Sequence, residues 1–172
     1  MPNKTSKPLV SIVMGSDSDL PIMSETARTL QQLEVPYEVE ITSAHRSPER
    51  TSNYARNAAK RGIKVIVAGA GGAFHLAGVI AAETTLPVIG VPIANSSLGG
   101  FDALLSAVQM PSGVPVGVMA VGKSGAVNAA VFSAQILATS DGALGVRLAR
   151  HKEEMARAVE EKSERVKQND QL

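Results

Sequence analysis

Short runs of apolar and β-branched residues recur along the chain and end at glycine or polar residues. The first, Leu9 to Met14, is interrupted only by Ser11 and is followed by Gly15. Such a run is typical of a strand buried on both faces of a parallel sheet. The segment 37–42 alternates instead, and it is rich in residues that favour strands. Together these patterns predict five strands, over 9–14, 37–42, 63–68, 87–91 and 116–121.

Between these runs, apolar residues recur at helical spacing, as Ile22, Met23, Ala27 and Leu30 do within 20–34. Ser47 followed by Pro48 predicts a helix start, with a capping serine and proline at the first helical position. Gly62 predicts the end of that helix. Helices are predicted over 20–34, 48–61, from the 69–75 loop to about 83, 102–109, 125–138 and 144–166.

Strand and helix alternate five times, which predicts a parallel sheet with helices on both faces. We therefore expect a three-layer αβα fold, doubly wound and flavodoxin-like, with an extra C-terminal helix. A chain of 172 residues fits one domain over 1–172. Its parts are the sheet and its helices over about 9–140, the terminal helix over 141–167, and flexible tails over 1–7 and 168–172.

Composition narrows the possible partners. The net charge is +1 and aromatic residues make up 3% of the chain, which argues against a nucleic-acid-binding surface. The chain has no cysteine, which excludes disulfides and thiolate metal sites. Neither an apolar signal segment nor a run of 18 apolar residues occurs, so we expect a cytoplasmic protein with no membrane partner.

Three unusual loops follow the first three predicted strands: 15–19, 43–46 and 69–75. Ligands of doubly wound sheets bind at the carboxyl ends of the strands. Each loop also precedes a helix N-terminus, where free N–H groups and the helix dipole favour an anion. The loops therefore predict one site at this edge of the sheet.

Taken one at a time, the residues in these loops can also be explained without a ligand site. Ser18 or Asp19 can cap the next helix, Arg46 can be a solvated surface residue, and one histidine at a sheet edge is more often structural. The convergence of two of the three histidines with Arg46 favours a site, whereas His151 on the charged terminal helix is expected at the surface. In such a site Arg46 suits a phosphate. Asp19 can accept hydrogen bonds from ribose hydroxyls, and His45 can carry a proton near neutral pH.

Two familiar motifs are rejected. Residues 117–124 satisfy GxxxxGK[ST], but the intervening residues form the predicted fifth strand instead of a loop. The glycines of 69–72 place Phe74 where a dinucleotide fingerprint needs its last glycine, and no acidic residue ends the next strand. His45 and His75 lack further ligands, so no metal site is expected.

Five segments of the chain form a recognisable set: MGSDSD at 14–19, SAHRSP at 43–48, AGAGGA at 68–73, HL at 75–76 and LSAVQMP at 105–111. Together they resemble the N5-carboxyaminoimidazole ribonucleotide mutases, the PurE family of bacterial purine biosynthesis. The resemblance covers about 10–138, in order and with matching spacing.

The resemblance implies a homo-octamer that moves a carboxylate from N5 to C4 of the aminoimidazole ring in IMP biosynthesis, without cofactor or metal. The resemblance also implies that carbon dioxide is released and recaptured in a closed site. His45 matches the family's proton-transfer residue, and Ser16, Asp19 and Arg46 match its ribonucleotide-binding positions. The remaining matched residues line the site: Ser18, Ser43, Ala44, Gly71, Gly72, Ala73, His75 and Leu76.

The chain departs from the family pattern at Phe74, at Ala77 where proline is usual, and at Ser112 where glycine is usual. These departures affect loop stiffness or pocket shape but not the matched proton carrier. Two alternatives stay open: a carboxylase that acts on aminoimidazole ribonucleotide and free carbon dioxide, and a non-catalytic nucleotide-binding module. The role of His75, substrate contact or loop support, is also open.

Overall fold

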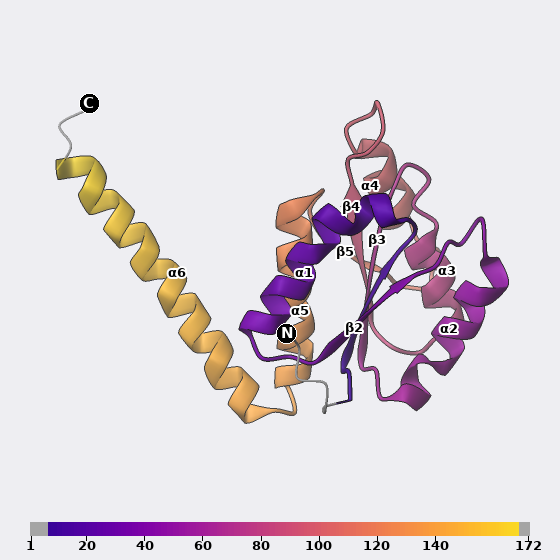
Figure 1. The fold of residues 1–172 in the computed structure, drawn as a ribbon, viewed down its shortest axis with the longest axis horizontal. Helices are drawn as coiled ribbons and strands as arrows, with labels where there is room; N and C mark the ends of the chain where they lie inside the picture. The colour runs from indigo at the N-terminus through magenta and orange to yellow at the C-terminus, as the bar shows by residue number, and fades with distance from the viewer. Residues whose placement is uncertain (1–6, 169–172) are drawn as a thin grey trace.

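The computed structural model describes residues 7–168, and within them five strands form one all-parallel sheet (Figure 1). The strand order β2-β1-β3-β4-β5 is the predicted flavodoxin-like order. The strands are β1 (Val10–Met14), β2 (Tyr37–Ile41), β3 (Val65–Gly71), β4 (Val88–Ile93) and β5 (Gly117–Val118). The predicted doubly wound α/β fold is confirmed.

Helices cover both faces of the sheet, and the core is split accordingly. On one face α1 (Leu20–Gln32) and α5 (Lys123–Ala138) pack over strand residues such as Ile12 and Val67. On the other, α2 (Pro48–Arg61), α3 (Leu76–Glu83) and α4 (Phe101–Val108) pack over residues such as Val13 and Ile66. Alternate residues of one strand thus serve opposite cores, which explains why these strands are continuously apolar.

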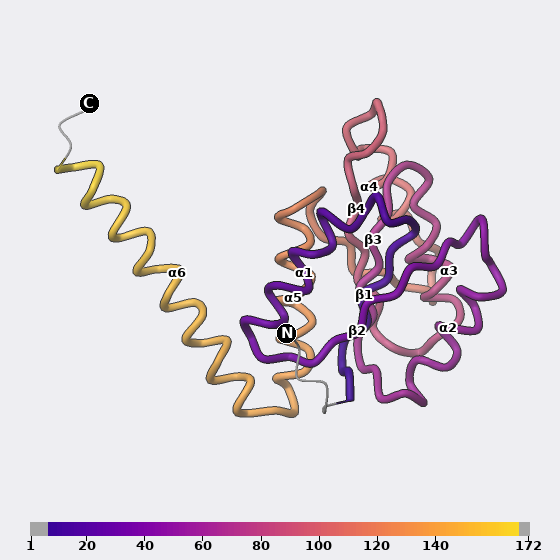
Figure 2. Tube along the Cα trace, viewed as in Figure 1, coloured from indigo at the N-terminus to yellow at the C-terminus, as the bar shows by residue number. Residues whose placement is uncertain are grey.

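The last helix, α6 (Gly142–Gln168), leads away from the sheet and from the helices that cover it (Figures 1 and 2). Leu144 near its start is buried in the core, whereas Val146, Met155, Val159 and Val166 are exposed. His151, expected at the surface, is partly exposed on this helix. Of the predicted tails, Lys7 and Gln168 are described and Gln168 belongs to α6; the other tail residues lie outside the described range.

The prediction for the fifth strand is wrong in length. Pairing with β4 covers only Gly117 and Val118, although a strand was expected over 116–121. After Gly90, the next position of β4 that could donate to β5 is Pro92, which has no N–H. The ladder therefore stops, and only isolated bonds follow, such as that from the Gly122 N–H to the Pro92 carbonyl at 2.8 Å.

The glycine segment after the third strand is also different from the prediction. Residues 69–71 were expected in a loop, but they extend β3 and pair with 91–93 of β4. A Cβ at Gly69 would lie 2.2 Å from the sulfur of the buried Met23, so any larger residue there must displace that side chain. The loop proper begins at Gly72, whose φ of +58° favours glycine.

No helix within residues 7–168 combines the length and the apolar character needed to span a membrane.

Candidate active site

The first loop is held in shape by Asp19. Its Oδ2 accepts a hydrogen bond from the Ser16 N–H at 3.2 Å, while the Ser16 hydroxyl accepts one from the Ser18 N–H at 3.3 Å. This reciprocal pair starts the short 3-10 turn η1 (Asp17–Asp19). Ser16 is thus the capping residue of this turn, and the Asp19 side chain makes no capping bond to α1.

The Asp19 carboxylate is almost completely buried, with 2% of the residue exposed. Burial raises the pKa of this carboxyl group above its ordinary value, although hydrogen bonds from Ser16 and Gly15 and the charge of Arg46 oppose the shift. Its Oδ1 lies 3.3 Å from the amide nitrogen of Asn95, which donates to it. An acceptor held in this way can receive hydrogen bonds from ligand hydroxyl groups.

The second loop joins β2 to α2 through a tight turn over 43–47. The Arg46 N–H donates to the Ser43 hydroxyl at 3.1 Å, and the Arg46 Nη2 donates to the Gly15 carbonyl at 2.8 Å. The second bond ties this loop to the first one. Ser47 occupies the position before Pro48, but the predicted capping bond is absent: its hydroxyl binds Ser43 instead.

The third loop brings His75 against His45. His45 Nε2 lies 2.7 Å from His75 Nδ1, and the two rings are nearly perpendicular, with their centroids 4.9 Å apart. The loop is anchored by the Phe74 N–H, which donates to the Ser106 hydroxyl at 3.0 Å, and by the Phe74 ring, which is 1% exposed in the core. Phe74, at which the chain departs from the family pattern, thus fills the core beneath the site.

The three loops line an open cavity of about 270 Å³. Ten of the twelve predicted site residues line it: Ser16, Ser18, Asp19, Ser43, Ala44, His45, Arg46, Gly71, Ala73 and Leu76. Gly72 and His75 do not line it, and His75 reaches the site through His45.

Sequence reasoning missed Gly15, Ala70 and Asn95, which also line the cavity. Asn95 follows β4 in the polar loop over 94–100, so its position at the carboxyl edge of the sheet was a signal for it. Its side chain stands over Gly71, where a Cβ would lie 1.7 Å from the Asn95 Oδ1. Gly71 therefore leaves the space that Asn95 fills.

The cavity combines a buried carboxylate, a guanidinium group and an imidazole near three helix starts. Such a set can bind a hydroxylated anion and move a proton. Within residues 7–168, no three His, Cys, Asp or Glu side chains gather closely enough to hold a metal ion.

Comparison with known proteins agrees with this arrangement. The sequence profile of the AIR carboxylase family matches residues 9–158. The chain belongs to this family. It is 54% identical over 165 residues to the N5-carboxyaminoimidazole ribonucleotide mutase of Pyrococcus horikoshii, a match that covers 96% of this chain and 92% of that protein.

Two further comparisons concern a carboxylase and a crystal structure. The chain is 55% identical over 141 residues to the phosphoribosylaminoimidazole carboxylase of Ogataea methanolica, a match that covers 82% of this chain but 26% of that protein. The crystal structure of Treponema denticola PurE superposes with a TM-score of 0.83 at 26% identity, covering 93% of this chain and 99% of that one. This chain is thus similar to proteins with both names, and its fold matches that of a PurE crystal structure.

Proposed function

We propose that this chain is an N5-carboxyaminoimidazole ribonucleotide mutase of purine biosynthesis, an isomerase that moves a carboxylate from N5 to C4 of its substrate. The identity of 54% over nearly the full length of a curated mutase supports this activity. The observation that carries the proposal is that His45, Arg46 and Asp19 line one cavity. A proton carrier, a phosphate-binding cation and a ribose-binding carboxylate are what such a substrate needs.

The roles follow from the chemistry of these groups. Arg46 and the N–H groups at the helix starts bind the 5′-phosphate, and Asp19 accepts hydrogen bonds from the ribose hydroxyls. Ser16, Ser18, Ser43 and Ala44 shape the wall that holds the ribonucleotide. Gly71, Ala73 and Leu76 supply a wall with little polar surface, which limits the water beside the reacting ring.

His45 moves the proton that the rearrangement requires. A proton delivered to N5 breaks the N–C bond and releases carbon dioxide, leaving aminoimidazole ribonucleotide. The electron-rich C4 then attacks carbon dioxide, and the proton on C4 must be removed to restore the ring. His45 gives the first proton and takes the second, so it ends each cycle as it began. The reaction is balanced without a cofactor or a metal ion.

The alternative with a specific observation in its favour is a carboxylase that uses free carbon dioxide, because the chain is 55% identical to a protein of that name. Separate assays with N5-carboxyaminoimidazole ribonucleotide and with aminoimidazole ribonucleotide plus bicarbonate distinguish the two. A mutase turns over the first substrate rapidly, and the second only at high bicarbonate. Faster turnover of the second at low bicarbonate would assign the carboxylase activity instead.

A single substitution tests the role of His45. His45→Asn keeps a hydrogen-bonding side chain but cannot carry a proton, so kcat should fall by about 10²–10⁴. Binding of the ribonucleotide, measured by calorimetry, should change little. Turnover equal to that of the parent would exclude His45 as the proton carrier. Ribonucleotide binding by a parent protein that shows no turnover would instead favour the non-catalytic binding module.

We also propose that the protein is located in the cytoplasm and has no nucleic-acid or membrane partner. We further propose that it is a homo-oligomer, an octamer as the resemblance implies. Met155, Val159 and Val166 on α6 are exposed apolar residues with the spacing of one helix face, and a second copy would cover them. Light scattering after gel filtration tests this directly. A monomer at micromolar concentration would contradict it.

A further inference from the structure

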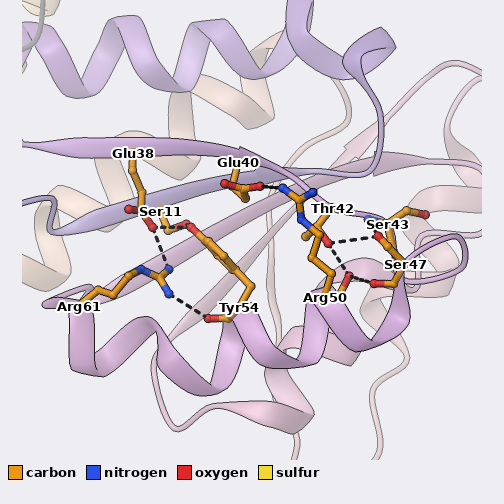
Figure 3. A network of polar contacts seen from close by, with 10 residues as sticks. Ser11, Glu38, Glu40, Thr42, Ser43, Ser47, Arg50, Tyr54 and Arg61 are labelled. Atoms are coloured by element: carbon orange, nitrogen blue, oxygen red, sulfur yellow. Dashed lines mark hydrogen bonds and ion pairs between the residues drawn. The ribbon is translucent and has the colours of Figure 1, made fainter.

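Four hydroxyl side chains gather where β2 passes into α2, beside the cavity. Figure 3 shows three of them, Thr42, Ser43 and Ser47; the fourth, Thr51, lies one turn into α2. Thr42 Oγ1 is 2.8 Å from Thr51 Oγ1. The Ser47 hydroxyl oxygen lies 3.1 Å from both the Ser43 nitrogen and the Ser43 carbonyl oxygen.

The direction of these bonds follows from counting protons, since each hydroxyl has one. Thr51 gives its proton to the Ser47 carbonyl at 3.1 Å, so Thr42 must be the donor to Thr51. Ser47 gives its proton to the Ser43 carbonyl and accepts one from the Ser43 N–H. The result is a chain of hydrogen bonds that runs from Thr42 through Thr51 to the backbone of Ser47.

The bonds between Ser43 and Ser47 close the turn that carries His45 and Arg46. The chain from Thr42 through Thr51 ends on Ser47. Ser43 and Ser47 stand at the two ends of the turn, and both are held by side-chain hydroxyls. Thr51 and Thr42 are both buried, so water cannot replace the Thr51 hydroxyl as the partner of Thr42. The Ser47 carbonyl also accepts the Thr51 N–H at 3.1 Å, and the hydroxyl adds a link from Ser47, at the end of the turn, to Thr42, just before its start. The turn is therefore braced by a residue that does not line the cavity.

We propose that Thr51 is a positioning residue of the active site: through Ser47 it fixes the turn that presents His45 to the reacting ring and Arg46 to the phosphate. The proposal rests on the function inferred above for these two residues. A proton carrier works only within hydrogen-bond reach of its target. The His45 side chain is exposed, and within residues 7–168 its one side-chain hydrogen bond is the bond to His75. The position of His45 therefore depends on the backbone of the turn.

Thr51→Val tests this, because valine has the shape of threonine but no hydroxyl. We expect kcat to fall about tenfold and KM to rise a few-fold, because the substitution removes the bonds of the hydroxyl to Thr42 and to the Ser47 carbonyl. Thr51→Ser restores the hydroxyl and should return kcat to within about twofold of the parent. Hydrogen–deuterium exchange of the 42–51 segment without substrate should be faster in the valine variant only.

The matched control is Thr26→Val on the other face of the sheet. Thr26 is also completely buried, and its hydroxyl donates to the Ala126 carbonyl at 2.9 Å. This variant should lose a similar amount of stability but keep the kcat of the parent and the slow exchange of 42–51. If Thr51→Val does not fold, Ser47→Ala, at a half-buried position, removes the side-chain bonds to Ser43 and should give the same two effects.

The proposal is overturned if Thr51→Val keeps parental kcat and exchange, or if Thr26→Val loses activity equally. The proposed function fails separately, if the parent turns over neither substrate. In that case the exchange measurement still decides whether the hydroxyls hold the turn.

Discussion

His45 and His75, on different loops, share one hydrogen bond of 2.7 Å between Nε2 of the first and Nδ1 of the second. Only one proton can lie between these two nitrogens, so the tautomer of one ring restricts the tautomer of the other. His75 does not line the cavity, and its ring meets that of His45 edge-on. We interpret His75 as a residue that orients the proton carrier and does not itself touch the substrate.

Replacing His75 tests this interpretation. His75→Leu removes the partner of His45, so kcat should fall about tenfold, which corresponds to the loss of one hydrogen bond. His75→Gln keeps a polar group of similar reach and should recover part of that loss. KM for the ribonucleotide should stay within about twofold in both variants, as steady-state kinetics will show. A large rise in KM with kcat unchanged would instead place His75 in contact with the substrate.

Much of the fold follows from local sequence patterns. The strands β1, β3 and β4 are recognised by their apolar runs, because burial on both faces leaves little choice of residue, whereas β2 is recognised by its alternation. Pro48 and Gly62 mark both ends of α2 correctly. The short β5 could not be foreseen in the same way, because its length depends on Pro92 of a neighbouring strand rather than on its own residues.

The site was predicted less completely, for a similar reason. The rule that ligands bind at the carboxyl ends of parallel strands placed three loops together, and ten of the twelve expected residues line one cavity. It does not say which side chains touch. The bond between His45 and His75, and the position of Asn95 over Gly71, depend on three-dimensional contacts between loops.

Arg46 offers a test of phosphate binding. Arg46→Gln removes the charge, and a charge-assisted hydrogen bond contributes about 1.5–3 kcal/mol, so KM should rise about 10- to 100-fold with a smaller change in kcat. The control is Arg56→Gln on α2, because Arg56 pairs with Glu83 away from the cavity. Steady-state kinetics of both variants suffice. Equal KM values for Arg46→Gln and Arg56→Gln would show that Arg46 does not hold the phosphate.

The buried carboxyl group of Asp19 predicts a dependence of stability on pH. Burial raises its pKa in the folded protein above the ordinary 3.8, so the folded state keeps this proton to higher pH than the unfolded state. The free energy of unfolding contributed by Asp19 is therefore highest below pH 3.8. It decreases as the pH rises through the folded pKa. At neutral pH the ionised group destabilises the fold.

Asp19→Asn should consequently be more stable than the parent at pH 7, and the difference in stability should shrink as the pH falls toward 4. The KM of this variant for the ribonucleotide should be higher than that of the parent. Urea unfolding at several pH values measures the difference in stability. Asp17→Asn, at an exposed position of the same turn, should change stability by less than about 0.5 kcal/mol. A less stable Asp19→Asn at pH 7 would mean that its hydrogen bonds outweigh the cost of burial.

Gly71 and Asn95 allow a prediction about the shape of the cavity. A Cβ at Gly71 would lie 1.7 Å from the Asn95 Oδ1, so Gly71→Ala must displace an exposed and flexible side chain. The fold should tolerate this with a loss of less than about 1 kcal/mol. However, Asn95 would lose its bond to Asp19 and intrude on the cavity, and we expect KM to rise about tenfold.

A double-mutant cycle with Asn95→Ala isolates this contact. In the Asn95→Ala background the displaced group is gone, so adding Gly71→Ala should change KM by less than about twofold. Gly69→Ala gives the contrast, because the added Cβ meets the buried Met23 sulfur at 2.2 Å. That substitution should cost about 1–3 kcal/mol of stability through overpacking, with KM of the folded enzyme unchanged. If Gly71→Ala impairs binding equally in both backgrounds, the glycine itself, and not the space it leaves for Asn95, is required by the substrate.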